Sequence, residues 1–219
     1  PDGYVLIAEP QTVVINPGDT QTLTFGNPPK GSLVINKLDA LTGEPLEGCL
    51  FKIIYADGKV VDDGKISSNG LYTTDRNGQI VISNITGTLV VTEEQTIPGY
   101  VIDPETRSQT VVVSPDDAQF LTFRNSPKGT LIVEKFDKAT DKPLEGAEFK
   151  IVTSAGELLA DNEGLTSTNG IYTTDENGQI VLSKLSPATY VVTETKAPEG
   201  YVLDPMPQTV VVNTADTQT

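Results

Sequence analysis

Short runs in which apolar and polar residues alternate predict β-strands along the whole chain. In the run at 31–37, Leu33, Ile35 and Lys37 fall on one face, because successive side chains of a strand point to opposite sides. The face is apolar until it ends at the lysine. This position predicts an amine carried toward the interior of a sheet structure.

Two later runs also end an apolar face with a polar side chain. Val91 and Glu93 share one face of their run, while Glu94 points the other way and is expected to be solvated. In the run that ends the repeat, Phe123 and Asn125 share a face. A Lys, a Glu and an Asn are therefore all predicted to point inward.

Turn signals separate these runs. Asp57 with Gly58, Asn77 with Gly78 and Asn177 with Gly178 are interpreted as hairpin turns between alternating segments. No long helical periodicity occurs. Many short strands joined by turns predict an all-β sandwich.

The same text occurs twice, so the chain is a repeat array. Lys37 and Lys135 stand 98 residues apart (135 − 37), and Asn27 and Asn125 stand at the same separation (125 − 27). A period of this length is about one small domain, which can bury a core of its own.

The period divides the chain into three parts. Residues 1–29 match only the end of a repeat and are expected to be the C-terminal strands of a preceding one, whereas 30–127 form a complete repeat. Residues 128–219 form a second repeat that stops before its last strand. We expect the segment to come from a longer array.

Composition argues against several classes of function. With 15 basic and 30 acidic residues the net charge is −15, which disfavours nucleic acids and anionic membranes as partners. No apolar run approaches the roughly 20 residues of a membrane span, so no membrane insertion is expected in this segment. The lack of His disfavours hydrolase and zinc sites, and the spacing of Asp75 and Asn77 is too short for a calcium loop. We expect no metal and no cofactor. Cys49 has no partner for an internal disulfide.

The inward Lys, Glu and Asn have a chemistry of their own if they meet in the core. Burial disfavours both charged forms, so a lysine there becomes a neutral nucleophile and a carboxylic acid becomes a proton donor. The acid can polarise the Asn carboxamide and pass a proton to the departing ammonia, which leaves a Lys to Asn amide. The alternative is that each is an ordinary strand residue whose polar tip reaches water.

The chain resembles the tandem CnaB-type, or SpaA-like, domains of Gram-positive surface proteins and pilins over essentially all its length. The resemblance depends on five matching stretches: the K.D of Lys37 and Lys135, the PLEGAEFKI that follows, the TDENG turn, the E..APEGY box from Glu194, and the final TF.N.

This resemblance implies tandem CnaB-like β-sandwiches of transthyretin-like or reversed immunoglobulin topology, each with a self-forming intramolecular isopeptide bond. By position, Lys37 would join Asn125 with Glu93 as the assisting acid. Lys135 and Glu194 would serve the second domain, and Asn27 would be the acceptor of the preceding domain. The protein would be extracellular and attached to the cell wall, with its anchor outside this segment.

The favoured function is a structural stalk or spacer repeat, with no enzyme activity beyond single-turnover formation of the bond. A ligand-binding adhesin module is the alternative, with loops 54–70 and 154–170 contacting a host protein or glycan, and a pilin subunit is a third. Residues 3–22 align with 200–219, so residues 23–27 of one molecule are also a candidate for end-to-end strand donation to the second domain of another. The simpler interpretation is an arbitrary boundary within a longer array of neighbouring repeats.

Overall fold

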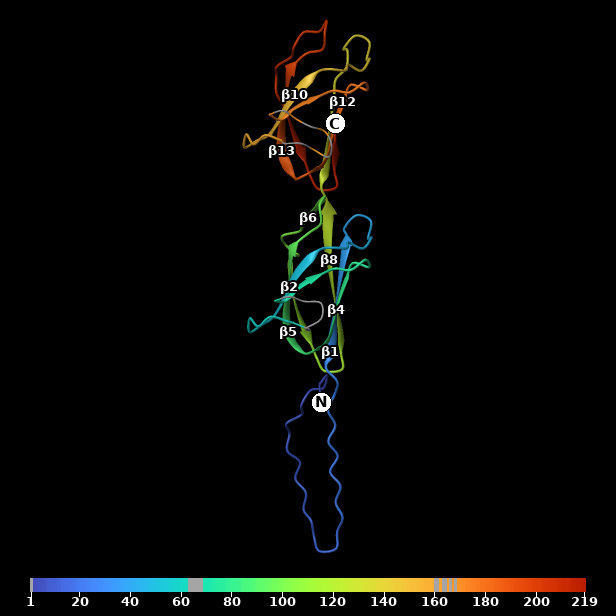
Figure 1. Cartoon of the computed structure of the whole chain (residues 1–219), viewed down its shortest axis with the longest axis vertical. Coiled ribbons are helices and arrows are strands. Elements are labelled where there is room, and N and C mark those ends of the chain that lie inside the picture. The colour runs from blue at the N-terminus through green and yellow to red at the C-terminus, as the bar shows by residue number, and fades with distance from the viewer. Residues whose placement is uncertain (1, 63–68, 160–161, 163–164, 166, 168) are drawn as a thin grey trace. The chain divides into compact units, whose positions relative to one another are not determined.

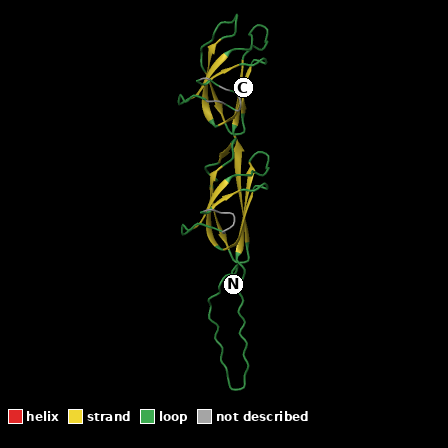
Figure 2. Ribbon diagram, viewed as in Figure 1, coloured by secondary structure: helices red, strands yellow, loops and turns green. Residues whose placement is uncertain are grey.

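The computed structural model contains strands and turns, and it describes every residue except 1, 63–68, 160–161, 163–164, 166 and 168 (Figure 2). The described residues separate into two compact units. The regular elements of the described residues are β-strands arranged in sheets, which confirms the predicted all-β class. Parts of the loops 54–70 and 154–170, named above as a candidate ligand surface, lie outside the described residues.

Two four-stranded sheets form the first domain (Figure 1). One has the order β4-β1-β8-β6 and the other the order β3-β2-β5-β7. The strands are β1 (Gly31–Asp39), β2 (Leu50–Tyr55), β3 (Leu71–Thr73), β4 (Gln79–Ile85), β5 (Gly87–Gln95), β6 (Tyr100–Ile102), β7 (Ser108–Val113) and β8 (Ala118–Pro127).

The first and last strands of this domain are neighbours and run parallel. The backbone N–H of Ser32 donates to the Asp117 carbonyl at 2.8 Å, and that of Ala40 to the Asn125 carbonyl at 2.9 Å. Both bonds span 85 positions (117 − 32 and 125 − 40), and a constant offset is the mark of a parallel pair. The two ends of the repeat thus meet in one sheet.

The predicted faces are present in these strands. Alternate residues of β1 are buried from Gly31 to Asp39, so Leu33, Ile35 and Lys37 share the interior face. Glu93 is buried on β5 while Glu94 is exposed. The strand pattern thus carries polar side chains into the same interior as the apolar ones.

The second domain repeats this arrangement with sheets β12-β9-β15 and β11-β10-β13-β14. Its last strand consists of two residues that pair in parallel with β9, at the place where β8 pairs with β1 in the first domain. The strands are β9 (Gly129–Glu134), β10 (Glu148–Thr153), β11 (Ile171–Thr173), β12 (Gln179–Leu185), β13 (Ala188–Lys196), β14 (Gln208–Val212) and β15 (Thr217–Gln218).

The N-terminal segment differs from its sequence pattern. Alternation at 4–27 predicts strands, but residues 2–29 contain no strand and one isolated bridge, between Tyr4 and Pro29. The turn predicted there is present, since the Asp19 N–H donates to the Asn16 carbonyl at 3.1 Å. A strand needs a neighbouring strand to satisfy its backbone groups, and the large apolar side chains of this segment are mostly exposed.

The turns at Asn77 and Asn177 reverse the chain but do not form hairpins between paired strands, which corrects the prediction. β3 pairs with β2 in one sheet, whereas β4 pairs with β1 in the other. The turn therefore carries the chain from one sheet to the opposite one. Turn chemistry fixes the local reversal and leaves the pairing partner to the rest of the fold.

Candidate functional site

Lys37 lies on β1 and its side chain is completely buried. Its backbone is held on both sides: the Lys37 N–H donates to the Gly78 carbonyl at 2.7 Å, and the Leu46 N–H donates to the Lys37 carbonyl at 2.9 Å. The turn at Gly78 and the loop at Leu46 thus fix the strand at the residue that carries the amine.

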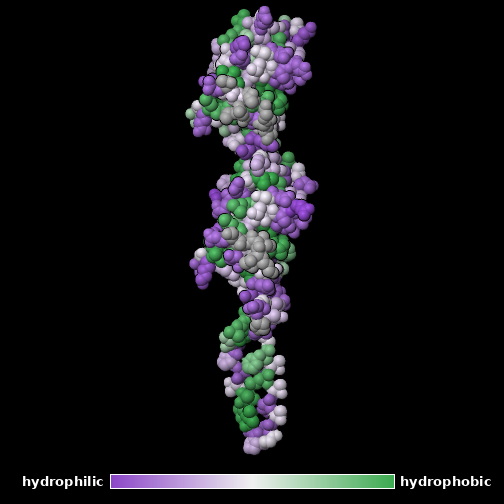
Figure 3. Space-filling model, in the orientation of Figure 1, coloured by the Kyte–Doolittle hydropathy of each residue, from purple (hydrophilic) through white to green (hydrophobic). Residues whose placement is uncertain are grey.

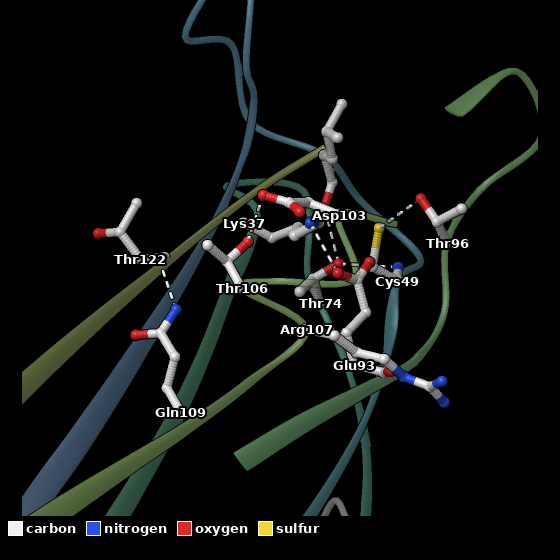
Figure 4. Close-up of polar contacts among 11 residues, drawn as sticks. Lys37, Cys49, Thr74, Glu93, Thr96, Asp103, Thr106, Arg107, Gln109 and Thr122 are labelled. Atoms are coloured by element: carbon white, nitrogen blue, oxygen red, sulfur yellow. Dashed lines mark hydrogen bonds and ion pairs between the residues drawn. The ribbon is translucent and has the colours of Figure 1, made fainter. Parts of the chain in front are cut away.

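Glu93 contacts this amine from the opposite sheet (Figure 4). The Lys37 Nζ donates to Glu93 Oε2 at 2.9 Å, with side-chain exposures of 0% and 1%. Arg107 fixes the backbone of Glu93, because its Nε donates to the Glu93 carbonyl at 2.9 Å and its own carbonyl accepts the Glu93 N–H. The carboxyl group is therefore positioned from both its side-chain and its backbone ends.

Asn125 is fully buried near the end of β8, the strand beside β1. Thr217 lies opposite Thr130 in the second domain, where the Thr130 N–H donates to the Asp216 carbonyl. In the first domain the Ser32 N–H makes the equivalent bond, to the Asp117 carbonyl, so Ala118 lies opposite Ser32. Each β1 residue therefore lies opposite the β8 residue that is 86 positions later in the sequence (118 − 32). Asn125 follows the position opposite Lys37 by two residues, on the same face of its strand.

Two buried aromatic rings lie on strands next to those that carry the Lys37–Glu93 pair. Phe51 lies opposite Glu93 in the pairing of β2 with β5, and its ring meets that of Phe123 edge to face, with centroids 4.9 Å apart. Both rings are buried. Water is thus kept from the amine by the packing that the sandwich core provides.

Burial lowers the pKa of Lys37 below its ordinary value of 10.5, and this effect outweighs the hydrogen bond and charge of Glu93, which act in the opposite direction. A lower pKa favours the neutral amine, which carries the lone pair that a nucleophile needs. Burial also raises the pKa of the nearby Cys49 thiol, so that group stays neutral. The arrangement can bring a nucleophile and a proton carrier together in a dry interior.

The second domain repeats the pair in a less enclosed form. The Lys135 Nζ donates to Glu194 Oε2 at 3.0 Å, and the lysine side chain is 21% exposed against 4% for the glutamate. The Asp204 N–H donates to the same carboxylate oxygen at 3.2 Å. Asn27, the asparagine predicted as the acceptor of the preceding domain, lies in the N-terminal segment and outside the strands.

Sequence analysis did not single out the residues that hold the loop beside Lys37. Thr74 is buried, and its hydroxyl donates to the Leu46 carbonyl at 2.7 Å and accepts the Cys49 N–H at 3.0 Å. Thr174 makes the same two bonds with Leu144 and Ala147 in the second domain. This threonine belongs to the sequence YTTD, which occurs in both repeats. Its recurrence was the signal that could have identified it as a structural residue.

The described residues contain no group of three or more His, Cys, Asp or Glu side chains that is able to hold a metal ion. Within the same part of the chain the structure has no helix long and apolar enough to cross a membrane.

A family model described as SpaA, a prealbumin-like fold domain, matches the chain twice, at residues 31–127 and 129–219. No curated protein matches the sequence.

Solved structures similar to the chain include the following three. The Bacillus anthracis TIE protein is 26% identical, with a TM-score of 0.42, over 88% of this chain and 34% of its own. The Streptococcal ancillary pilin is 22% identical, with a TM-score of 0.48, over 94% of this chain and 67% of its own. The shaft pilin SpaA from Lactobacillus rhamnosus GG is 18% identical, with a TM-score of 0.49, over 86% of this chain and 96% of its own. The chain thus spans about a third of the length of the TIE protein.

Proposed function

The chain belongs to the SpaA family of prealbumin-like fold domains, and from this membership we propose that it is a structural spacer of a Gram-positive surface protein, held together by a Lys37–Asn125 amide. In this role it lies outside the cell, as part of a protein attached to the cell wall. The observation that carries the proposal is the fully buried Lys37–Glu93 pair, whose lysine lies on the strand beside that of the buried Asn125.

The bond forms once per domain and balances without any further reagent. The neutral Nζ of Lys37 attacks Cγ of Asn125, the Cγ–Nδ2 bond breaks, and Nδ2 leaves as ammonia. Glu93 first donates its proton to the carboxamide oxygen, then takes the proton released by the amine and passes it to the leaving nitrogen, and finally recovers its own proton from that oxygen as the amide forms. The protein is thus its own single-turnover catalyst and no enzyme toward other substrates.

A bond at this place suits a spacer because of where the strands lie. β1 and β8 are the first and last strands of the domain and are direct neighbours. Force applied to the chain enters at one of them and leaves at the other, so the amide carries it past the 89 residues from Lys37 to Asn125 (125 − 37 + 1). The domain then resists extension without its hydrogen bonds having to break.

Single-molecule stretching tests this role. We expect the parent's first domain to show no unfolding step, and Lys37→Ala to release a contour length of roughly 300 Å for those 89 residues, at about 3.3 to 3.6 Å per residue. Lys59→Ala, which removes an exposed lysine, is the matched control and should behave as the parent. An equal extension in the parent and in Lys37→Ala would overturn the spacer proposal.

A further inference from the structure

The strand that carries Glu93 changes its pairing at this residue. In the register of β2 with β5, Phe51 lies opposite Glu93. The preceding residue, Leu50, lies opposite Gln95, so Glu94 is an extra residue between the two pairs. This is a β-bulge, in which two residues of one strand face a single residue of the other. Burial alternates along β5 up to Glu93, whereas Glu94 and Gln95 are both exposed. Glu93 is thus the last inward residue before the bulge.

Arg107 holds both residues of this bulge. Its Nε donates to the Glu93 carbonyl at 2.9 Å, and its Nη2 donates to Glu94 Oε2 at 3.4 Å. The Arg107 carbonyl also accepts the Glu93 N–H at 2.9 Å, so backbone and side chain contact the strand at one point (Figure 4). The pairing of β5 with β7 ends one position earlier, at Thr92 and Ser108. Arg107 therefore continues the contact between these two strands as far as the bulge.

An exposed pair of Arg and Glu would not by itself indicate a role. The side chains of Arg107 and Glu94 are 48% and 41% exposed, and such pairs contribute little to stability because water screens them. Hydrophilic residues are spread over the visible face of the first domain, so charged groups at its surface are ordinary (Figure 3). This pair differs because the same guanidinium also contacts Glu93, whose side chain is 1% exposed.

The second domain has the same bulge and holds it in another way. Phe149 lies opposite Glu194 in the pairing of β10 with β13. The preceding residue, Glu148, lies opposite Lys196, so Thr195 is the extra residue. The Thr195 hydroxyl donates to the Glu148 carbonyl at 3.1 Å, which fixes the bulge to the neighbouring strand. The bulge after the glutamate is therefore a repeated feature of the fold.

A methionine takes the position of Arg107 in the second domain. Arg107 comes two residues before Gln109, which begins the sequence QTVVV in β7. Met206 comes two residues before Gln208, which begins the same sequence in β14. A thioether cannot donate a hydrogen bond, and the Met206 side chain is 75% exposed. A different side chain therefore holds the bulge in each domain: Arg107 in the first and Thr195 in the second.

We propose that Arg107 is a positioning residue for formation of the amide in the first domain. It holds the bulge so that Glu93, and not Glu94, faces the amine of Lys37. This inference rests on the proposed function. A shift of one residue at the bulge would bring Glu94 inward and turn Glu93 to solvent, because successive side chains of a strand point to opposite faces. The contact between Arg107 Nη2 and Glu94 opposes this shift, since it would break if Glu94 turned inward.

The test follows formation of the amide with time, as loss of ammonia and as the branched peptide, in chains made by cell-free synthesis and denatured at intervals. Arg107→Met, which copies the second domain, should slow the reaction on the order of 100-fold, the cost of displacing a reacting group by about 1 Å. Adding Glu94→Thr should restore the rate, because a threonine hydroxyl can hold the bulge as Thr195 does. Glu94→Thr alone, and Arg76→Met, which removes an exposed arginine, should match the parent.

A purely structural role of Arg107 is distinguished in the Asn125→Ala background, where no amide forms. There Arg107→Met should speed hydrogen exchange of the Glu93 N–H, and Glu94→Thr should slow it again, because exchange reports local opening of the bulge. Denaturant unfolding should change little, since the Arg107–Glu94 pair is exposed.

An amide that forms at the parental rate in Arg107→Met would overturn the inference, and so would a slow rate that Glu94→Thr leaves slow. If the parent itself loses no ammonia, the proposed function is wrong and hydrogen exchange decides the hold of Arg107 on the bulge. Faster exchange at Glu93 in Arg107→Met then supports that hold, and unchanged exchange overturns it.

Discussion

A lysine and a glutamate with no exposure to water are costly residues for a domain of this size. Transfer of each charge from water costs several kcal/mol, and the attraction between them repays this only in part. Lys37 and Glu93 are nevertheless enclosed by rings and strands that the fold needs for other reasons. Their burial supports the proposed reaction, in which the neutral amine would be consumed as the domain forms.

The lowered pKa of Lys37 predicts how stability depends on pH when the bond cannot form. In Asn125→Ala, the unfolded chain binds a proton at this lysine up to its ordinary pKa of 10.5, whereas the folded domain releases it at lower pH. The free energy of unfolding should therefore rise with pH between the folded pKa and 10.5, by at most about 1.4 kcal/mol per pH unit. Denaturant unfolding at a series of pH values measures it.

The control removes the titrating amine. The double variant Lys37→Met with Asn125→Ala keeps a side chain of similar length and should lack this rise. Identical pH profiles in the two variants would show that Lys37 titrates normally in the folded domain.

At the scale of elements, alternation and repetition in the sequence were sufficient to predict the strands and inward faces of the two repeats, though not of the N-terminal segment. Lys37, Glu93 and Asn125 were predicted to be interior because a period of two fixes the face of each strand residue. Alternation says nothing about which strands become neighbours, so the turn at Gly78 was assigned to a hairpin although it joins two sheets. The strands predicted within 4–27 depend on partners that the pattern of a single segment does not reveal.

The turn at Gly78 is predicted to hold Lys37 in place. Gly78 has a φ of +67°, and a Cβ at this position would collide with the carbonyl oxygen of Lys37. Gly78→Ala should therefore displace β1, slow formation of the amide and cost more than the roughly 1 to 2 kcal/mol of the left-handed backbone alone. Intact mass against time after refolding gives the rate, and denaturant unfolding gives the stability.

Gly43→Ala is the matched control, because Gly43 has a similar φ of +78° and a Cβ added there would meet no atom within 4 Å. It should lose stability through the backbone alone and form the amide at the parental rate. Equal rates in the two variants would mean that the turn does not position the lysine.

At the scale of the molecule, the amide is expected to dominate the stability of the first domain. Closing a loop of 89 residues lowers the entropy of the unfolded state and so raises its free energy, by roughly 4 to 5 kcal/mol on the loop-entropy estimate. Between Asn125 and Lys135 only nine residues remain extensible, 126–134 (134 − 126 + 1). A spacer built in this way consists of locked domains and short connections.

Asn125→Ala should therefore lower the melting temperature of the first domain by roughly 16 to 40 °C, at about 4 to 8 °C per kcal/mol. The variant keeps the Lys37–Glu93 pair, so the change reports the missing bond rather than an unpaired buried charge. Calorimetry measures it, and Asn27→Ala serves as the control that removes an asparagine outside the strands. Melting of Asn125→Ala at the parental temperature would mean that no bond stabilises the domain.

The most direct test of the central claim is the intact mass of the denatured monomer, compared with that of Glu93→Ala. We predict that the parent has lost one ammonia and that its digest contains one branched peptide joining Lys37 to Asn125. Glu93→Ala should keep its full mass, with circular dichroism to verify that it folds. A parent at full mass, or a folded Glu93→Ala that has lost ammonia equally, would contradict the account.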